Sequence, residues 1–196
     1  MAVDDGNLYW TDLLVLTVTA RSYSLVDGFL AAFDAWNPVV AAPIVRMQLD
    51  SLIRIAYAAE VNTDELTKYV VEGGELRRRK DSEGKLLTDR RLVELAAEAH
   101  PWLKGVYEAS SGWVHLSPDL LHAVVEFSNR AENEGDPPEM WVGVGIPIRR
   151  ERIPLQALEE LIGAMTQATE EIFGYIEAWE SRKGLPVGQV RDLGPD

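Results

Sequence analysis

Residues 38–60 read PVVAAPIVRMQLDSLIRIAYAAE, and this stretch decides the fold. Apolar residues recur along it every three or four positions, which predicts a helix with one broad buried face. Asn37 is a favourable N-cap and Pro38 is tolerated at the first helical position, so the helix is expected to run from Pro38 to about Glu60. Helical patterns on both sides of this stretch predict a mainly α fold, a bundle of about five to six helices.

The flanking helices are placed by apolar periodicity together with start and stop signals. Asn62 and Glu65 have the spacing of a capping box, and Thr88 is a suitable N-cap for a later helix. A proline opens each of the last two helices, because its fixed φ suits the first turn. The expected flanking helices cover about residues 8–36, 62–71, 88–99, 101–116 and 154–182.

Two segments between these helices have a different character. Residues 120–146 place short runs of β-branched and aromatic residues on either side of the turn-rich NRAENEGDPPE, which predicts a small antiparallel β-hairpin before the long C-terminal helix. Residues 72–89 are dominated by glycine and charge and are expected to form an exposed loop. The chain is therefore expected to be a single helical domain over residues 1–183, followed by a loose tail over residues 184–196.

The composition excludes several classes of protein. The 196 residues carry 32 acidic against 19 basic side chains, and the net charge of -13 opposes binding to RNA, DNA or anionic membranes. The absence of cysteine excludes disulfides, thiolate metal sites and a cysteine nucleophile. The first ten residues are acidic, unlike a signal peptide, and no uninterrupted apolar run approaches the roughly 18 residues of a membrane span. A cytoplasmic protein without a membrane span is expected.

Two sets of polar residues repeat at a spacing of four, so each set lies along one helix face. The first set is Arg46, Asp50 and Arg54, and the second is Tyr107, Ser111 and His115. The first set stands among residues that must face a core. If the two helix faces meet, a polar seam crosses that core.

The seam has a catalytic and a structural interpretation. In the catalytic one, His115 is a general acid or base, and Ser111 or Tyr107 positions a proton or the substrate. Arg46 or Arg54 then stabilises an anion. In the structural one, the aspartate of the first set pairs with both arginines in a buried hydrogen-bonded network.

Other candidate sites are fewer. The basic cluster Arg77, Arg78, Arg79 and Lys80 is either a phosphate contact or a solvated loop balanced by nearby acids. The spacing of the three histidines matches no common zinc pattern. No glycine-rich phosphate loop, nucleophile elbow or dinucleotide fingerprint is present, so neither a metal nor a cofactor is expected.

Two short motifs carry a resemblance to a known group. RMQLDSLIR at residues 46–54 and YEASSGWVHLSP at residues 107–118 resemble a widespread group of bacterial proteins that is similar in outline to HEPN-like helical bundles. The resemblance spans the chain from Arg46 to the hairpin. It implies a dimeric bundle, often tied to phage defence or toxin-antitoxin systems, in which some members cleave RNA without metal. Their catalytic pattern is an arginine followed after four to six residues by a histidine, and no histidine here has an arginine at that distance.

Two functions are therefore considered. The first is a non-catalytic helical interaction module that forms a homodimer, with apolar helix faces at its interface, or binds a protein partner. The alternative is a HEPN-like metal-independent ribonuclease or nucleotide-acting enzyme that uses His115 with Arg46. The net charge disfavours RNA as a partner.

Overall fold

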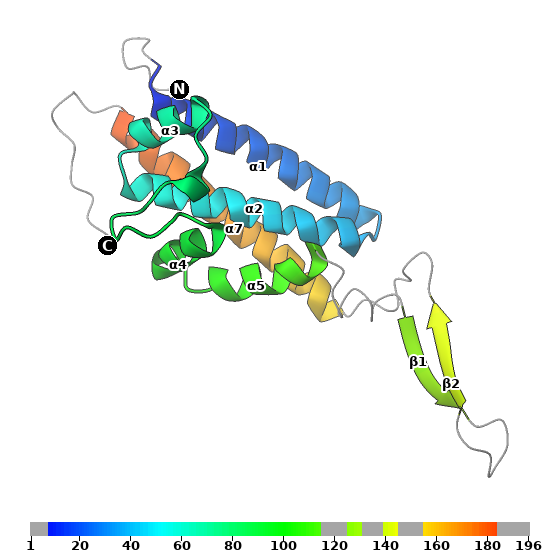
Figure 1. Ribbon diagram of the computed structural model, residues 1–196. Helices are drawn as coiled ribbons and strands as arrows, with labels where there is room; N and C mark the ends of the chain where they lie inside the picture. Colours follow the sequence, from blue (N-terminus) through cyan, green and yellow to red (C-terminus); the bar gives the residue numbers. More distant parts are fainter. Residues whose placement is uncertain (1–7, 115–124, 131–138, 145–154, 184–196) are drawn as a thin grey trace.

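The computed structural model describes residues 8–114, 125–130, 139–144 and 155–183 (Figure 1). These residues form mainly α-helices, which confirms the predicted helical bundle. In chain order the elements are α1 (Trp10–Asp34), α2 (Pro38–Glu60), α3 (Thr63–Val71), the short 3-10 helix η1 (Leu76–Arg78), α4 (Asp89–Ala99), α5 (Leu103–Val114), β1 (Val125–Arg130), β2 (Glu139–Val144) and α7 (Leu155–Lys183).

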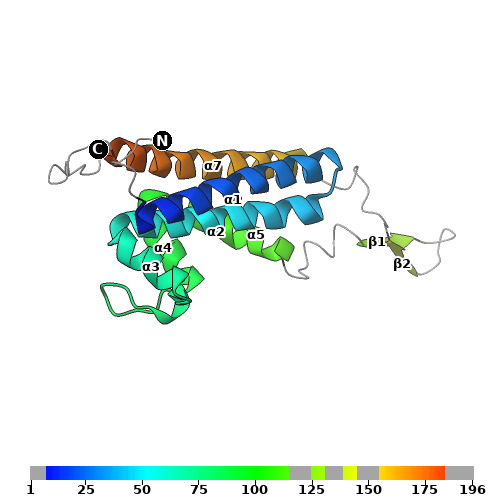
Figure 2. The same ribbon diagram turned by 90° about the horizontal axis from the view of Figure 1, so that it is seen from above.

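Helix α2 is the central element of the bundle. It packs against α1, α3, α4, α5 and α7, and Figures 1 and 2 show α1 and α7 running alongside it. Leu49, Leu52 and Ile53 have no exposed surface, and each contributes about 1.5–3 kcal/mol to folding by leaving water. Gln48 is also buried, and its Nε2 donates to Thr169 Oγ1 on α7 at 3.0 Å.

Polar side chains begin three of the helices where the sequence places caps. The side-chain oxygen of Asn37 accepts from the backbone amide of Val40, three residues into α2, at 3.3 Å. The Asn62 and Thr88 side chains accept in the same way at the starts of α3 and α4. Each cap satisfies an amide that has no partner inside the helix.

The strands β1 and β2 pair with each other in antiparallel register. Val125 lies opposite Val144 and Arg130 lies opposite Glu139. The other residues of the predicted hairpin, 120–124, 131–138 and 145–146, lie outside the described residues. Of the strand residues whose burial is described, Val125 is half-buried and residues 140 and 142–144 are exposed.

The segment between α3 and α4 is a packed loop. Most of its side chains are exposed as expected, but it also contains η1 and an isolated bridge between Lys80 and Leu86. Leu87 is 1% exposed and belongs to the core. Arg91 Nε donates to the nearly buried carboxylate of Asp81 at 2.7 Å, which ties the loop to α4.

Helix α1 is more apolar than the sequence analysis predicted. By length and composition alone it could cross a membrane, with a mean hydropathy of 1.3 over its best window. Arg21 interrupts the apolar run in its middle, whereas a mean hydropathy over the window includes that charge. Only 22% of the window is buried, so α1 leaves apolar surface uncovered.

Candidate functional site

One end of the predicted polar seam joins α2 to α5. The guanidinium of Arg46 stacks over the ring of Tyr107, with its central carbon 3.1 Å from the ring centroid. Burial raises the pKa of the Tyr107 hydroxyl, and the positive charge of Arg46 opposes that rise. Ser111 lies one turn further along α5, but its side chain and all of His115 lie outside what the structure describes.

The other end of the seam lies at a partly solvated edge. Asp50 bonds to Arg54 within α2, and its Oδ2 accepts from Arg21 of α1 at 3.2 Å. Arg54 also reaches Asp89 at the start of α4, at 3.2 Å. The Asp50 side chain keeps 22% of its surface exposed, so these four charges connect three helices beside the core, with access to water.

Sequence reasoning identified two of these four charges. Arg21 and Asp89 are separated from their partners by 29 and 35 residues, and no local spacing marks them. Asp50 and Arg54 were recognisable because a separation of four places them on one helix face. Their position at the edge of the core depends on how α1 and α4 pack on α2.

The predicted nucleic-acid cluster lies in the packed loop and at its η1 turn. It consists of Arg77, Arg78, Arg79 and Lys80. The first two arginines are more than 70% exposed and both pair with Glu75, while the third pairs with Glu65 at 2.6 Å. Arg77 and Arg78 share the single negative charge of Glu75, and Glu65 offsets the charge of Arg79. These carboxylates weaken the attraction that a phosphate would feel.

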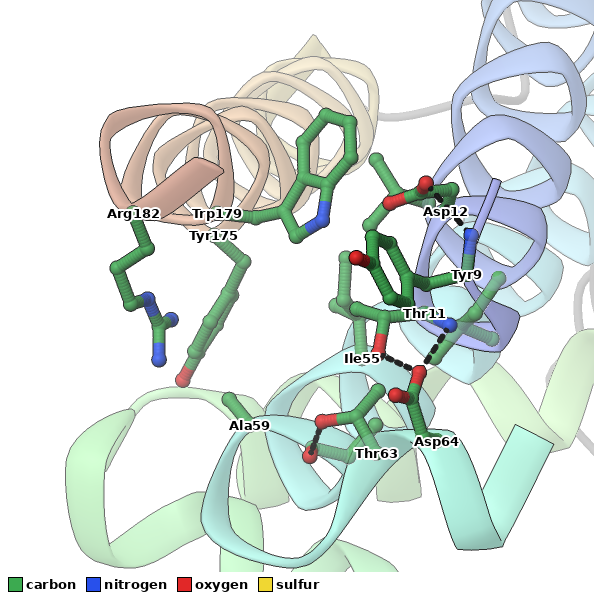
Figure 3. A pocket seen from close by; sticks show the side chains of 13 residues that line it. Tyr9, Thr11, Asp12, Ile55, Ala59, Thr63, Asp64, Tyr175, Trp179 and Arg182 are labelled. Carbon is green, nitrogen blue, oxygen red and sulfur yellow. Dashed lines mark hydrogen bonds between the residues drawn. The ribbon is translucent and has the colours of Figure 1, made fainter. Parts of the chain in front are cut away.

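A pocket of about 350 Å³ lies where the start of α1, the start of α3 and the end of α7 come together (Figure 3). The rings of Tyr9, Tyr175 and Trp179 form much of its wall. Beside it, Asp64 Oδ1 accepts from the amide and the hydroxyl of Thr11 at 2.7 and 2.6 Å. These bonds fasten α3 to the first turn of α1.

Tyr175 also belongs to a partly buried polar group that sequence reasoning missed. His100 is 7% exposed, its Nε2 lies 2.8 Å from Tyr175 Oη, and its Nδ1 lies 3.3 Å from a carboxylate oxygen of Glu171. Burial raises the pKa of the Tyr175 hydroxyl, and the carboxylates of Glu60 and Glu171 act in the same direction. The phenol therefore keeps its proton, and the group holds the α4–α5 junction on α7.

An apolar groove of about 590 Å³ runs between α1 and α7. Its apolar lining comprises Val26, Phe29, Leu30, Phe33, Ile162, Met165 and Phe173. Leu16, Tyr23 and Leu30 continue this surface along α1, with exposed fractions of 44%, 62% and 53%. The rings of Tyr23 and Phe173 form a T-shaped pair with centroids 6.0 Å apart, so the aromatic surface is continuous from α1 to α7.

Neither a metal site among the described residues nor a match to a known protein identifies the chemistry of these sites. Among the described residues, no group of three or more His, Asp or Glu side chains could hold a metal ion. The chain matches no protein-family model, no curated protein and no solved structure. The HEPN-like resemblance therefore stays a prediction.

Proposed function

We propose that the protein is a non-catalytic helical interaction module that forms a homodimer through α1. The observation that carries this proposal is the apolar stripe on α1, which consists of Leu16, Tyr23 and Leu30. These residues are seven positions apart and therefore lie on one face of the helix. A helix of this hydropathy with only 22% of its window buried needs a further surface to cover it.

The spacing of the stripe suits two-fold symmetry. A symmetric dimer needs a patch that is complementary to itself. If two α1 helices cross antiparallel at Tyr23, Leu16 of each copy lies opposite Leu30 of the other, because both are seven residues from Tyr23. Asp27 then lies opposite Thr19 of the other copy. Asp34 lies opposite Asp12, whose carboxylate is buried within its own protomer and accepts from the backbone amide of Tyr9.

The groove beside the stripe supplies the depth that an interface needs. Side chains from the second α1 can enter between α1 and α7, so that α1 and α7 of the two copies form a four-helix arrangement. Tyr23 is a suitable central anchor, because aromatic residues in well-packed pockets contribute most to interface energies. The ring of Phe173 in the same protomer already packs against the ring of Tyr23.

The same contacts weigh against the ribonuclease alternative. An RNA-cleaving site needs an arginine that is free to meet the phosphate. Here Arg46 stacks on Tyr107, and Arg54 bonds to Asp50 and Asp89. Ribonuclease activity of the purified protein that disappears in His115→Ala, with an unchanged melting temperature, would favour the alternative.

Light scattering coupled to size exclusion, at micromolar concentration, tests the dimer. The wild-type chain should elute at twice its 21.8 kDa mass. Tyr23→Glu should elute at the single-chain mass, because it brings two carboxylates together at the symmetry axis. Met47→Glu is the matched control, since Met47 is 41% exposed on α2 and does not line the groove, and it should remain a dimer.

Two results would contradict the proposal. A wild-type mass of 21.8 kDa at these concentrations means that the stripe does not pair two copies. A dimer that survives Tyr23→Glu but dissociates in Met47→Glu places the interface on α2 instead. Circular dichroism of both variants checks that each one retains its helices.

A further inference from the structure

The pocket between the starts of α1 and α3 and the end of α7 has three aromatic rings in its wall. Figure 3 shows Tyr9 and Tyr175 on opposite sides of the pocket, with Trp179 between them. The contact of 2.8 Å between Tyr175 Oη and His100 Nε2 holds the Tyr175 ring in place. The face of an aromatic ring carries partial negative charge and attracts cations. The wall therefore suits a positively charged ligand better than a negatively charged one.

One carboxylate oxygen of this pocket is left for a ligand. Asp64 Oδ1 accepts both bonds from Thr11, whereas Oδ2 makes no hydrogen bond or ion pair with any described residue. Asp64 is half-buried, and its Oδ2 keeps solvent-accessible surface. Figure 3 shows this oxygen on the side of the carboxylate nearer to Thr63, which also lines the pocket. A positive group inside the pocket can therefore reach it.

The charges around the pocket favour an occupant with one positive charge. Asp12 and Asp64 both line the pocket, and Arg182 lines it as well. The Nε of Arg182 donates to the carbonyl of Ala178 in its own helix at 3.1 Å, and Figure 3 shows Arg182 on the far side of Tyr175 from Asp64. Two carboxylates and one guanidinium leave one negative charge in excess. An organic cation of single charge balances it.

We infer that this pocket binds a small organic ammonium ion, held by cation–π contacts with the three rings and by the charge of Asp64. Its volume of about 350 Å³ is at the lower end of small-molecule sites, which suits a ligand of a few carbon atoms. Ile55 and Ala59 supply apolar wall for the methyl or methylene groups of such an ion. The site is independent of the proposed dimer, because no residue of the stripe on α1 lines it.

Isothermal titration calorimetry of the full chain with choline tests the inference. The wild-type protein should bind choline, and it should bind dimethylbutanol, the uncharged carbon isostere of choline, about 10-fold or more weakly. Asp64→Asn should weaken choline binding about 10-fold, because it removes the charge but leaves an oxygen that can accept from Thr11. Glu180→Gln removes the same charge from an exposed position on α7 outside the pocket, and this control should bind choline normally.

A second pair of variants tests the aromatic wall. Tyr9→Phe keeps the ring and should bind choline as the wild type does. Tyr9→Leu removes the ring and should bind choline about 2- to 5-fold more weakly, the range of an exposed cation–π contact. Tyr9 is 41% exposed and precedes α1, so both variants should keep the fold, and this pair decides the outcome if Asp64→Asn unfolds.

Three results would overturn the inference. The first is no binding of choline to the wild-type protein, or equal binding of choline and dimethylbutanol. The second is an equal loss in Asp64→Asn and Glu180→Gln, which would mean that the overall negative charge attracts the cation. The third is equal binding to Tyr9→Phe and Tyr9→Leu. None of these results depends on the dimer, because the pocket lies within one protomer.

Discussion

The Asp50 carboxylate bonds to Arg54 and Arg21 while keeping 22% of its side-chain surface exposed. Removing one partner of a fully buried ion pair costs about 3–5 kcal/mol. A partly solvated network contributes less, since water screens the charges that remain after the substitution. Partial exposure therefore lowers the loss of stability expected for Asp50→Ala.

We predict that Asp50→Ala lowers the free energy of unfolding by about 1 kcal/mol. The loss should shrink at high salt, because counterions screen solvated ion pairs. Urea denaturation at low and high salt measures both effects, with Glu108→Ala on the exposed surface of α5 as the control. A loss of about 3 kcal/mol or more that does not depend on salt would mean that Asp50 is buried as first expected.

Among the structural elements, the loop between α3 and α4 differs most from the structure that its composition predicts. Its composition predicts an exposed loop, and most of its side chains are exposed. Leu87 nevertheless enters the core, and the Asp81 carboxylate is 3% exposed beside Arg91. Burial alone would raise the pKa of Asp81, but hydrogen bonds from Arg91 and from the amides of Lys85 and Glu83 outweigh it, so the pKa is lowered.

This lowered pKa predicts how the loop responds to acid. A carboxyl with a lower pKa in the folded state stabilises the fold above its unfolded pKa of about 3.9, and that contribution is lost as the pH falls through the folded pKa. Asp81→Asn should therefore be less stable than the wild type at pH 7, and the difference should narrow below about pH 4.

Urea denaturation across this pH range measures the difference between the two proteins. Glu98→Gln, on the exposed surface of α4, is the control and should follow the wild type at every pH. A constant difference between Asp81→Asn and the wild type from pH 7 to pH 3 would contradict the assigned role of the carboxylate. Trypsin cleavage in the loop should be faster in Asp81→Asn at neutral pH, since the Arg91 bond fastens the loop to α4.

At the scale of the whole molecule, α1 has two possible coverings for its apolar surface. By length and hydropathy it could cross a membrane, and its stripe also suits a second copy of the chain. The net charge of -13 opposes approach to an anionic membrane. A dimer covers the stripe without moving α1 away from α2, which α1 contacts along its length (Figure 2).

We predict that the protein does not float with lipid vesicles, whether these are neutral or anionic, because the proposed dimer would cover the stripe. Density-gradient flotation measures this, and repeating it at high salt tests whether charge repulsion alone prevents binding. Tyr23→Glu also should not float, since its new charge lies on the exposed face of α1. Wild-type protein in the vesicle fraction would indicate that lipid, not a second copy, covers α1.

Part of the candidate site could be predicted from sequence because it depends on helix geometry. Arg46 and Tyr107 each belong to a set repeated at a spacing of four, and their contact joins the two helices that these sets mark. The stripe on α1 is also visible once residues seven apart are compared. His100 gave no signal, because its partner Tyr175 is 75 residues away along the chain.

The sequence by itself determined the helices, their N-caps and the mainly α class of the bundle. These features depend on contacts between residues three or four positions apart, which the order of amino acids sets directly. Only the tertiary structure decided which distant groups meet: Arg21 with Asp50, Thr11 with Asp64, and His100 with Tyr175 are 29, 53 and 75 residues apart. Such pairs form because packing on α2 fixes the helices side by side, and no local pattern encodes that arrangement.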